Sequence, residues 1–226
     1  QNEFIAAASH ELRSPLAVIE SSVTAIAAAE ESSAAPRSAE CLEKQTQYLK
    51  NIRAECSRMA ALVGDMLLLA STDAGSWSVK RETVDMDTLL IETYELYEPV
   101  CRSSGIRLFL DLPEETLPHI TGDSFRLKQL LTILLDNAVS YTPEDRGITI
   151  SAAVNGKELT ISVADQGCGI PPEARAHIFD RFYRSDSSRT DKRHFGLGLS
   201  IAKELAVLHG GRISVDETEG GGAAFR

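Results

Sequence analysis

The sequence predicts two parts of different fold class: an antiparallel helical hairpin that dimerises into a four-helix bundle, then a two-layer α/β sandwich. Three observations support this. Residues 3–30 and 39–72 carry apolar side chains at helical spacing. A polar stretch with a proline, residues 31–38, separates them. From residue 79 onward, helical and strand patterns alternate. A chain of 226 residues is long enough for each part to bury a core of its own.

The apolar residues of the hairpin form narrow stripes. In the first helix they recur in steps of four and three, at Leu12, Leu16, Ile19, Val23 and Ile26. The second helix carries two seven-residue series, Leu42, Leu49, Cys56 and Val63, and Gln45, Ile52, Met59 and Met66. Such spacing is typical of coiled-coil seams. Because two helices enclose little core between them, we expect a homodimer in which two hairpins pair.

The second part is expected to contain three helices and six strands. The helices are expected at 86–102, 123–140 and 197–209, and the strands at 106–111, 118–121, 147–154, 158–164, 211–216 and 222–226. The predicted domains are therefore 1–73 and 79–226, joined by a linker at 74–78. The sequence between 72 and 78, TDAGSWS, has the polar composition of such a linker.

Composition excludes several classes of protein. Hydrophobic residues make up 43% and charged residues 25%, which argues against a disordered or disulfide-dominated chain. The formal net charge of −10 argues against binding to nucleic acid or to an anionic membrane surface. Apolar runs such as 66–70 are far shorter than the roughly 20 residues of a membrane helix. The four cysteines show no metal-ligand spacing, so we expect reduced thiols.

A histidine stands on the first helix within the string FIAAASHELRSPL, residues 4–16. At about 100° per residue, His10 lies roughly 200° from Leu12 and so faces away from the apolar stripe. A neutral imidazole can act as a nucleophile. Glu11 follows directly and could accept its proton. A lone histidine on a helix surface carries no such meaning, so this interpretation depends on the whole string.

A glycine-rich string, DQGCGIP at 165–171, follows an expected strand. Glycines let the backbone approach a flat ligand closely, and a carboxylate at a strand end can accept from an exocyclic amine. Alone, this string is more typical of a turn than of a ligand site. The sequence contains no G-x-x-x-x-G-K-[ST] motif, which argues against a P-loop nucleotide site.

Further strings surround this one in a fixed order, namely LDNAVSYT at 135–142 with Asp123 upstream, IFDRFYR at 178–184, FGLGLSIAK at 195–203 and GGGAAF at 220–225. The string at 4–16 resembles the H-box of sensor histidine kinases, with Ser14 where that family usually has Thr or Asn. The others resemble the N, G1, F, G2 and G3 boxes of the histidine-kinase ATP-binding domain. The resemblance covers nearly all of the chain and implies a sandwich of the GHKL ATPase type.

The resemblance implies a protein histidine kinase. ATP would donate a phosphoryl group to His10 with Glu11 as base, and the phosphoryl group would pass to an aspartate of a response-regulator receiver domain. Glu11 and Ser14 would also support dephosphorylation of that partner.

In the ATP site, the resemblance implies that Asn137 ligates Mg²⁺ between the phosphates and that Asp165 binds the adenine amino group. Tyr141 and Ile170 would line the base pocket. Segment 172–195 would be a lid whose basic part, 181–194, clamps the triphosphate. The other expected ATP-binding residues are Gly167, Gly169, Arg184, Arg189, Gly196, Leu197 and Gly198.

Two positions depart from the family pattern. Ile133 stands four residues before Asn137, where hydrolytic relatives have a water-activating Glu and histidine kinases more often have Asn. Ser140 stands where histidine kinases often have Lys. An isoleucine cannot act as a base, which argues against a GHKL ATPase that only hydrolyses ATP. The missing polar contacts leave open a second interpretation, a degenerate dimeric signalling module that does not phosphorylate.

The chain begins at Gln1 and stops at Arg226 within an expected strand. We therefore expect part of a longer protein, truncated at its C-terminal end. The fragment itself would be cytoplasmic and free of direct membrane contact, with a missing N-terminal region as the anchor.

Overall fold

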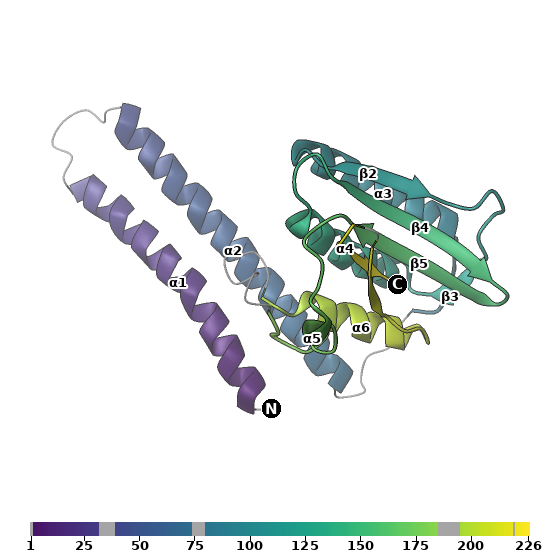
Figure 1. Ribbon diagram of the computed structural model, residues 1–226. Helices are drawn as coiled ribbons and strands as arrows, with labels where there is room; N and C mark the ends of the chain where they lie inside the picture. Colours follow the sequence, from purple (N-terminus) through teal and green to yellow (C-terminus); the bar gives the residue numbers. More distant parts are fainter. Residues whose placement is uncertain (1, 32–38, 74–79, 185–194, 219) are drawn as a thin grey trace. The chain divides into compact units, whose positions relative to one another are not determined.

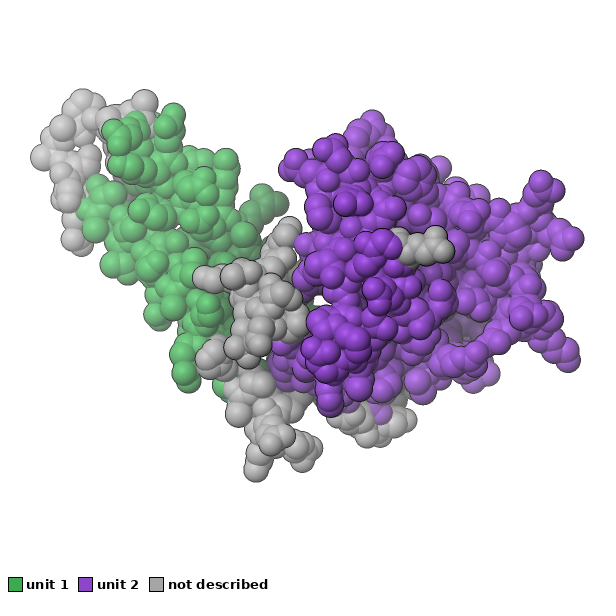
Figure 2. Space-filling view, viewed as in Figure 1, with its two compact units in different colours: residues 1–70, 190–195 green, residues 71–189, 196–226 purple. Residues whose placement is uncertain are grey.

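A computed structural model describes residues 2–31, 39–73, 80–184, 195–218 and 220–226 (Figure 1). The chain divides into two compact units, one formed by residues 1–70 and 190–195 and the other by 71–189 and 196–226 (Figure 2). The first unit is helical and the second mixes helices and strands, as the sequence predicts. The expected linker at 74–78 lies outside the described residues.

The first unit is a hairpin of two long helices, α1 (Asn2–Glu31) and α2 (Ala39–Asp73), which lie side by side in Figure 1. Both predicted helices are confirmed to within one residue at each end. Along α1 the buried residues Ala8, Pro15 and Ser22 recur every seven positions. The larger side chains of the predicted seams remain exposed in the single chain, among them Leu16, Val23, Leu49 and Val63.

The second unit is built on a five-stranded sheet in the order β2-β4-β5-β7-β6. Its strands are β2 (Arg107–Asp111), β4 (Gly147–Asn155), β5 (Glu158–Asp165), β6 (Val215–Glu217) and β7 (Ala223–Phe225). β2 pairs with β4 in parallel, and the other pairs are antiparallel. A separate pair joins β1 (Glu82–Val84) to β3 (Ile120–Gly122). The expected, largely antiparallel sheet is confirmed.

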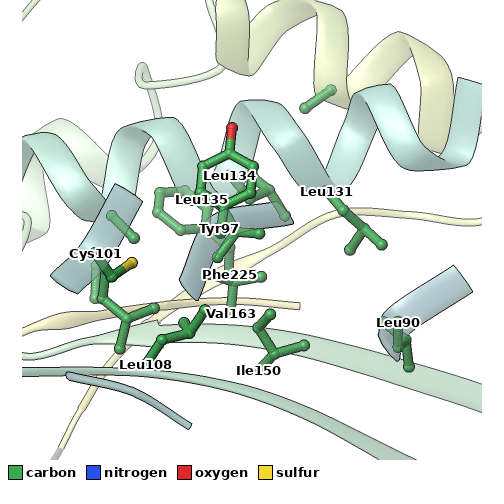
Figure 3. Packing of buried hydrophobic residues seen from close by; sticks show 14 of the residues in the cluster. Leu90, Tyr97, Cys101, Leu108, Leu131, Leu134, Leu135, Ile150, Val163 and Phe225 are labelled. Atoms are coloured by element: carbon green, nitrogen blue, oxygen red, sulfur yellow. The ribbon is translucent and has the colours of Figure 1, made fainter. Parts of the chain in front are cut away.

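Three helices form the second layer: α3 (Met86–Ser103), α4 (Ser124–Tyr141) and α6 (Gly198–Leu208). They cover one face of the sheet (Figure 1). The core lies between the layers, where Leu131, Leu134 and Leu135 of α4 meet the strand side chains (Figure 3). Its other members include Leu90, Tyr97, Cys101, Leu108, Ile150, Val163 and Phe225. A two-layer α/β sandwich is thus confirmed.

The structure adds two short elements to those expected: strand β1 and the one-turn helix α5 (Pro172–Arg175). The last two strands are shorter than their predicted ranges, and β6 begins only at Val215. Among the described residues, no helix combines the length and the apolar character that crossing a bilayer requires.

Candidate functional site

Asp165 ends strand β5 and is 4% exposed. Its Oδ1 accepts hydrogen bonds from the backbone N–H groups of Gly167 (2.8 Å) and Ala223 (3.2 Å). Burial raises the pKa of this carboxyl, and these two hydrogen bonds act in the opposite direction. Both fall on Oδ1, so Oδ2 can accept from a ligand. The carboxylate is therefore held in one orientation, as selection of a hydrogen-bond donor requires.

Glycines allow three segments to meet around Asp165. A Cβ on Gly167 would lie 2.4 Å from the carbonyl oxygen of Tyr141, at the end of α4. A Cβ on Gly169, whose φ is +70°, would lie 2.1 Å from the carbonyl oxygen of Gly221. These distances leave no room for a side chain. The loop after β5, the end of α4 and the turn before β7 thus pack backbone against backbone.

Helix α4 brings Asn137 and Tyr141 to the same place. The helix begins at Asp123, whose Oδ1 accepts from the N–H of Arg126 at 3.1 Å, a side-chain N-cap. Asn137 and Tyr141 are four residues apart and so share one face. Both are partly buried. Because Tyr141 contacts the Gly167 loop, the structure brings Asn137, Tyr141 and Asp165 to one region.

The N-terminus of α6 is a candidate anion site. Leu197 occupies its N-cap position and provides no side-chain cap, so the first amides of α6 can receive a ligand. Gly196 precedes it with a φ of +73°. Leu197 as a whole is 1% exposed, and its side chain is among the largest fully buried ones. Gly198 opens the helix and packs against Ile133 of α4.

The structure adds site residues that the sequence analysis does not assign. Arg175 of α5 donates from Nε to the carbonyl oxygen of Ile170 at 3.0 Å and pairs with Glu217 at 2.9 Å. Thr218 Oγ1 donates to the backbone oxygen of Asp165 at 3.0 Å. The GGGAAF string gave a signal for Ala223. No motif marks Arg175 or Thr218, whose partners Glu217 and Asp165 lie 42 and 53 residues away.

The remaining predicted residues are only partly described. Arg184 is partly buried after α5. Arg189 and most of the basic segment 181–194 lie outside the described residues. In the hairpin, Glu11 is partly buried and Ser14 is exposed on α1. His10 lies in α1, but its expected orientation away from the seam concerns a side chain outside the described part.

The residues fit a nucleotide that carries its own metal ion. Within the described ranges, no cluster of three or more His, Cys, Asp or Glu residues could hold a metal. Mg²⁺ is usually bound through few protein ligands together with phosphate and water oxygens. The amide oxygen of Asn137 could supply such a ligand.

Two known protein families match this chain, one in its N-terminal and one in its C-terminal part. Residues 1–75 match the His Kinase A (phospho-acceptor) domain, and residues 122–226 match the histidine kinase-, DNA gyrase B- and HSP90-like ATPase. Sensor histidine kinase WalK of Bacillus subtilis is 36% identical over all of this chain, which spans 36% of WalK. The chain thus spans about a third of this relative.

Solved structures show the same arrangement of elements. Full-length ShkA, crystallised with AMPPNP, is 31% identical, with a TM-score of 0.71 over 99% of this chain and 44% of that one. ThkA in complex with the response regulator TrrA has a TM-score of 0.71 at 23% identity, over 99% of this chain and 59% of that one. This chain belongs to the sensor histidine kinases and comprises their phospho-acceptor hairpin and GHKL-type ATP-binding domain.

Proposed function

We propose that this chain transfers the γ-phosphoryl group of ATP to His10 and then to an aspartate of a response-regulator receiver domain. A P–N bond forms at an imidazole nitrogen while the bond to the β–γ bridging oxygen breaks and ADP leaves. Glu11 accepts the imidazole proton. Mg²⁺, held by Asn137, would neutralise phosphate charge.

The observation that carries this proposal is the orientation of Asp165. A buried carboxylate whose Oδ1 takes two backbone N–H groups offers Oδ2 to a donor such as the adenine amino group. The uncapped N-terminus of α6 then provides amides for the phosphates. Tyr141 and Ile170 border the base, and Gly167, Gly169, Gly196 and Gly198 let the backbone approach the nucleotide.

Two features support the proposed partners. The seam residues exposed on the single hairpin favour a homodimer, in which they would be covered. ThkA crystallised with TrrA supports a response-regulator receiver domain as phosphoryl acceptor. Glu11 and Ser14, one turn apart on α1, could also orient a water for dephosphorylation of the regulator.

Incubation with γ-labelled Mg-ATP tests this function. The wild type is expected to acquire acid-labile, base-stable label, and His10→Ala to acquire none while still binding nucleotide. Label on His10→Ala would refute the assignment of the phospho-acceptor. Nucleotide binding without any label on the wild type would favour the degenerate signalling module instead, and ATP turnover without a phosphoprotein would indicate a GHKL ATPase.

A further inference from the structure

His209 links the two helices that carry the candidate phosphate ligands. It follows directly after α6, and its ring is partly buried. Its Nδ1 lies 2.8 Å from the carbonyl oxygen of Leu205, one turn back in α6. Its Nε2 lies 3.1 Å from the backbone nitrogen of Asp123, the N-cap residue of α4. A single imidazole thus joins the end of α6 to the start of α4.

These two contacts define the protonation state of the ring. The carbonyl of Leu205 can only accept, so Nδ1 must carry a proton. The backbone N–H of Asp123 can only donate, so Nε2 must offer its lone pair. Only the neutral tautomer with its proton on Nδ1 makes both bonds. Protonation of Nε2 would set its new N–H against the N–H of Asp123, and the Asp123 N–H would lose this acceptor.

Gly122 makes room for the ring. A Cβ at this buried position in β3 would lie 2.7 Å from Cδ2 of His209. Real Cβ atoms do not approach this closely, so any other residue at 122 would push the imidazole away from the Asp123 amide. The end of β3 is therefore shaped around the imidazole.

The link joins the two helices that carry candidate ATP-site residues, α4 and α6. α4 and α6 run antiparallel: Asp123 meets His209 at one end, and Ile133 meets Gly198 at the other. Asn137 lies 14 residues after Asp123, about 21 Å along α4. The link therefore fixes one end of a helix pair whose other end presents Asn137 and the first amides of α6.

The charged groups around the junction do not replace the link when the ring is protonated. The Asp123 carboxylate is the neighbouring anion, but its Oδ1 accepts from Arg126 N–H and its Oδ2 from Lys80 N–H. Glu82 accepts from Lys80 and from Ser124. Lys80 and Arg126 also add positive charge beside an imidazolium. A new bond from the imidazolium to the Asp123 carboxylate would still leave the Asp123 N–H without its acceptor.

We propose that His209 is a positioning residue of the ATP site and that its neutral imidazole sets the register of α4 against α6. Protonation of the ring, which breaks the contact with the Asp123 N–H, then lowers nucleotide affinity. The inference rests on the proposed function, because it concerns the same ATP site.

Calorimetric titration with Mg-AMPPNP at about pH 8 and at about pH 5.5 tests this, since histidine as a residue type changes charge between about pH 5 and 8. His209→Gln keeps an acceptor for the Asp123 N–H and does not titrate. The wild type is expected to lose about two- to tenfold more affinity than His209→Gln across this range, the equivalent of one hydrogen bond. His119→Gln, at an exposed histidine, is the matched control and should follow the wild type.

A second variant displaces the ring without removing it. Gly122→Ala should weaken Mg-AMPPNP binding both at about pH 8 and at about pH 5.5, and its affinity should change with pH no more than that of His209→Gln. His209→Gln should keep the wild-type melting temperature at about pH 8. Parallel pH profiles for wild type and His209→Gln would overturn this inference alone. Absence of binding in every protein at every pH would overturn the proposed function together with it.

Discussion

The side chain of Ile133 faces the first residue of α6: its Cγ2 lies 3.3 Å from where a Cβ on Gly198 would stand. Ile133 is partly buried, packs against the edge of the core, and lies one helical turn before Asn137. An apolar side chain thus occupies a place beside the amides expected to bind phosphate. A polar side chain there could bind the metal or the phosphates.

We therefore expect Ile133→Asn to tighten Mg-ATP binding. A hydrogen bond to a charged group contributes about 1.5–3 kcal/mol, which corresponds to roughly ten- to a hundredfold in affinity. Titration calorimetry with Mg-ATP gives the affinity, and thermal melting gives the stability of both proteins.

Ile133→Val is the matched control, because it keeps an apolar side chain at the same place, and it should bind Mg-ATP as the wild type does. The competing interpretation is that Ile133 serves only the core. Unchanged or weaker affinity of Ile133→Asn, together with a lower melting temperature, would support that interpretation and refute the prediction.

A second prediction concerns Tyr97, whose hydroxyl donates to Oδ1 of Asp136 at 2.6 Å and joins α3 to α4 beside Asn137. Burial and then the Asp136 carboxylate raise the pKa of Tyr97 far above its ordinary value of 10.0. Since the folded pKa is the higher one, this stabilisation is complete below about pH 10 and is lost as the pH rises further. Tyr97→Phe should lower the free energy of unfolding by about 1–2 kcal/mol at neutral pH.

Urea titrations at neutral and at alkaline pH measure both effects. The wild type should lose stability above about pH 10, and the difference between wild type and Tyr97→Phe should shrink there. Tyr94→Phe, on the same helix and less buried, is the control. If the free energies of unfolding of wild type and Tyr97→Phe differ equally at both pH values, the hydroxyl does not stabilise the fold through its hydrogen bond to Asp136.

The long elements could be predicted because their burial follows a local period. Along α4 the buried residues Leu131, Leu134, Leu135 and Ala138 recur at helical spacing, and this pattern is visible in the sequence. The three-residue strand β1 has no period to detect. It is a strand because Val84 pairs with Ile120 across 36 residues, a tertiary contact.

The site residues divide in the same way, into those that a local motif identifies and those that only a tertiary contact identifies. The motifs identified Asp165 and Asn137, because glycines and polar side chains in a fixed order carry the resemblance. The orientation of Asp165 depends on Ala223, 58 residues away, and its backbone oxygen accepts from Thr218, 53 residues away. The link between His209 and Asp123 spans 86 residues and leaves no local pattern.

Asp165→Asn tests the adenine contact. Its amide oxygen can still accept from Gly167 and Ala223, but its NH₂ group would oppose the adenine amino group. Nucleotide affinity should fall about a hundredfold. Because burial raises the pKa of Asp165, ionisation costs folding stability as the pH rises above 3.8. The variant should therefore melt at the same temperature as the wild type or higher at pH 7, and a marked decrease would indicate a structural role.

Cys168 offers a chemical test of the same loop. Its thiol is exposed between Gly167 and Gly169, whereas Cys101 is buried. N-ethylmaleimide should alkylate Cys168, and nucleotide at about ten times its Kd should slow that reaction about tenfold. The buried Cys101 is the internal control and should remain unmodified with and without nucleotide. Peptide mass spectrometry measures the alkylation of each cysteine, and an unchanged rate at Cys168 in the presence of nucleotide would argue against a nucleotide site at this loop.

The last prediction concerns the seam of the hairpin. Leu49 is 60% exposed in the single chain, so a charge there leaves the monomer solvated. In the expected four-helix bundle the same charge would be buried without a partner, at a cost of several kcal/mol. Leu49→Glu should therefore sediment as a folded monomer at micromolar concentration, where the wild type sediments as a dimer. Gln47→Glu places the same charge about 200° away on α2 and should remain dimeric. A monomeric wild type would refute the expected dimer, and a dimeric Leu49→Glu would place the dimer interface elsewhere.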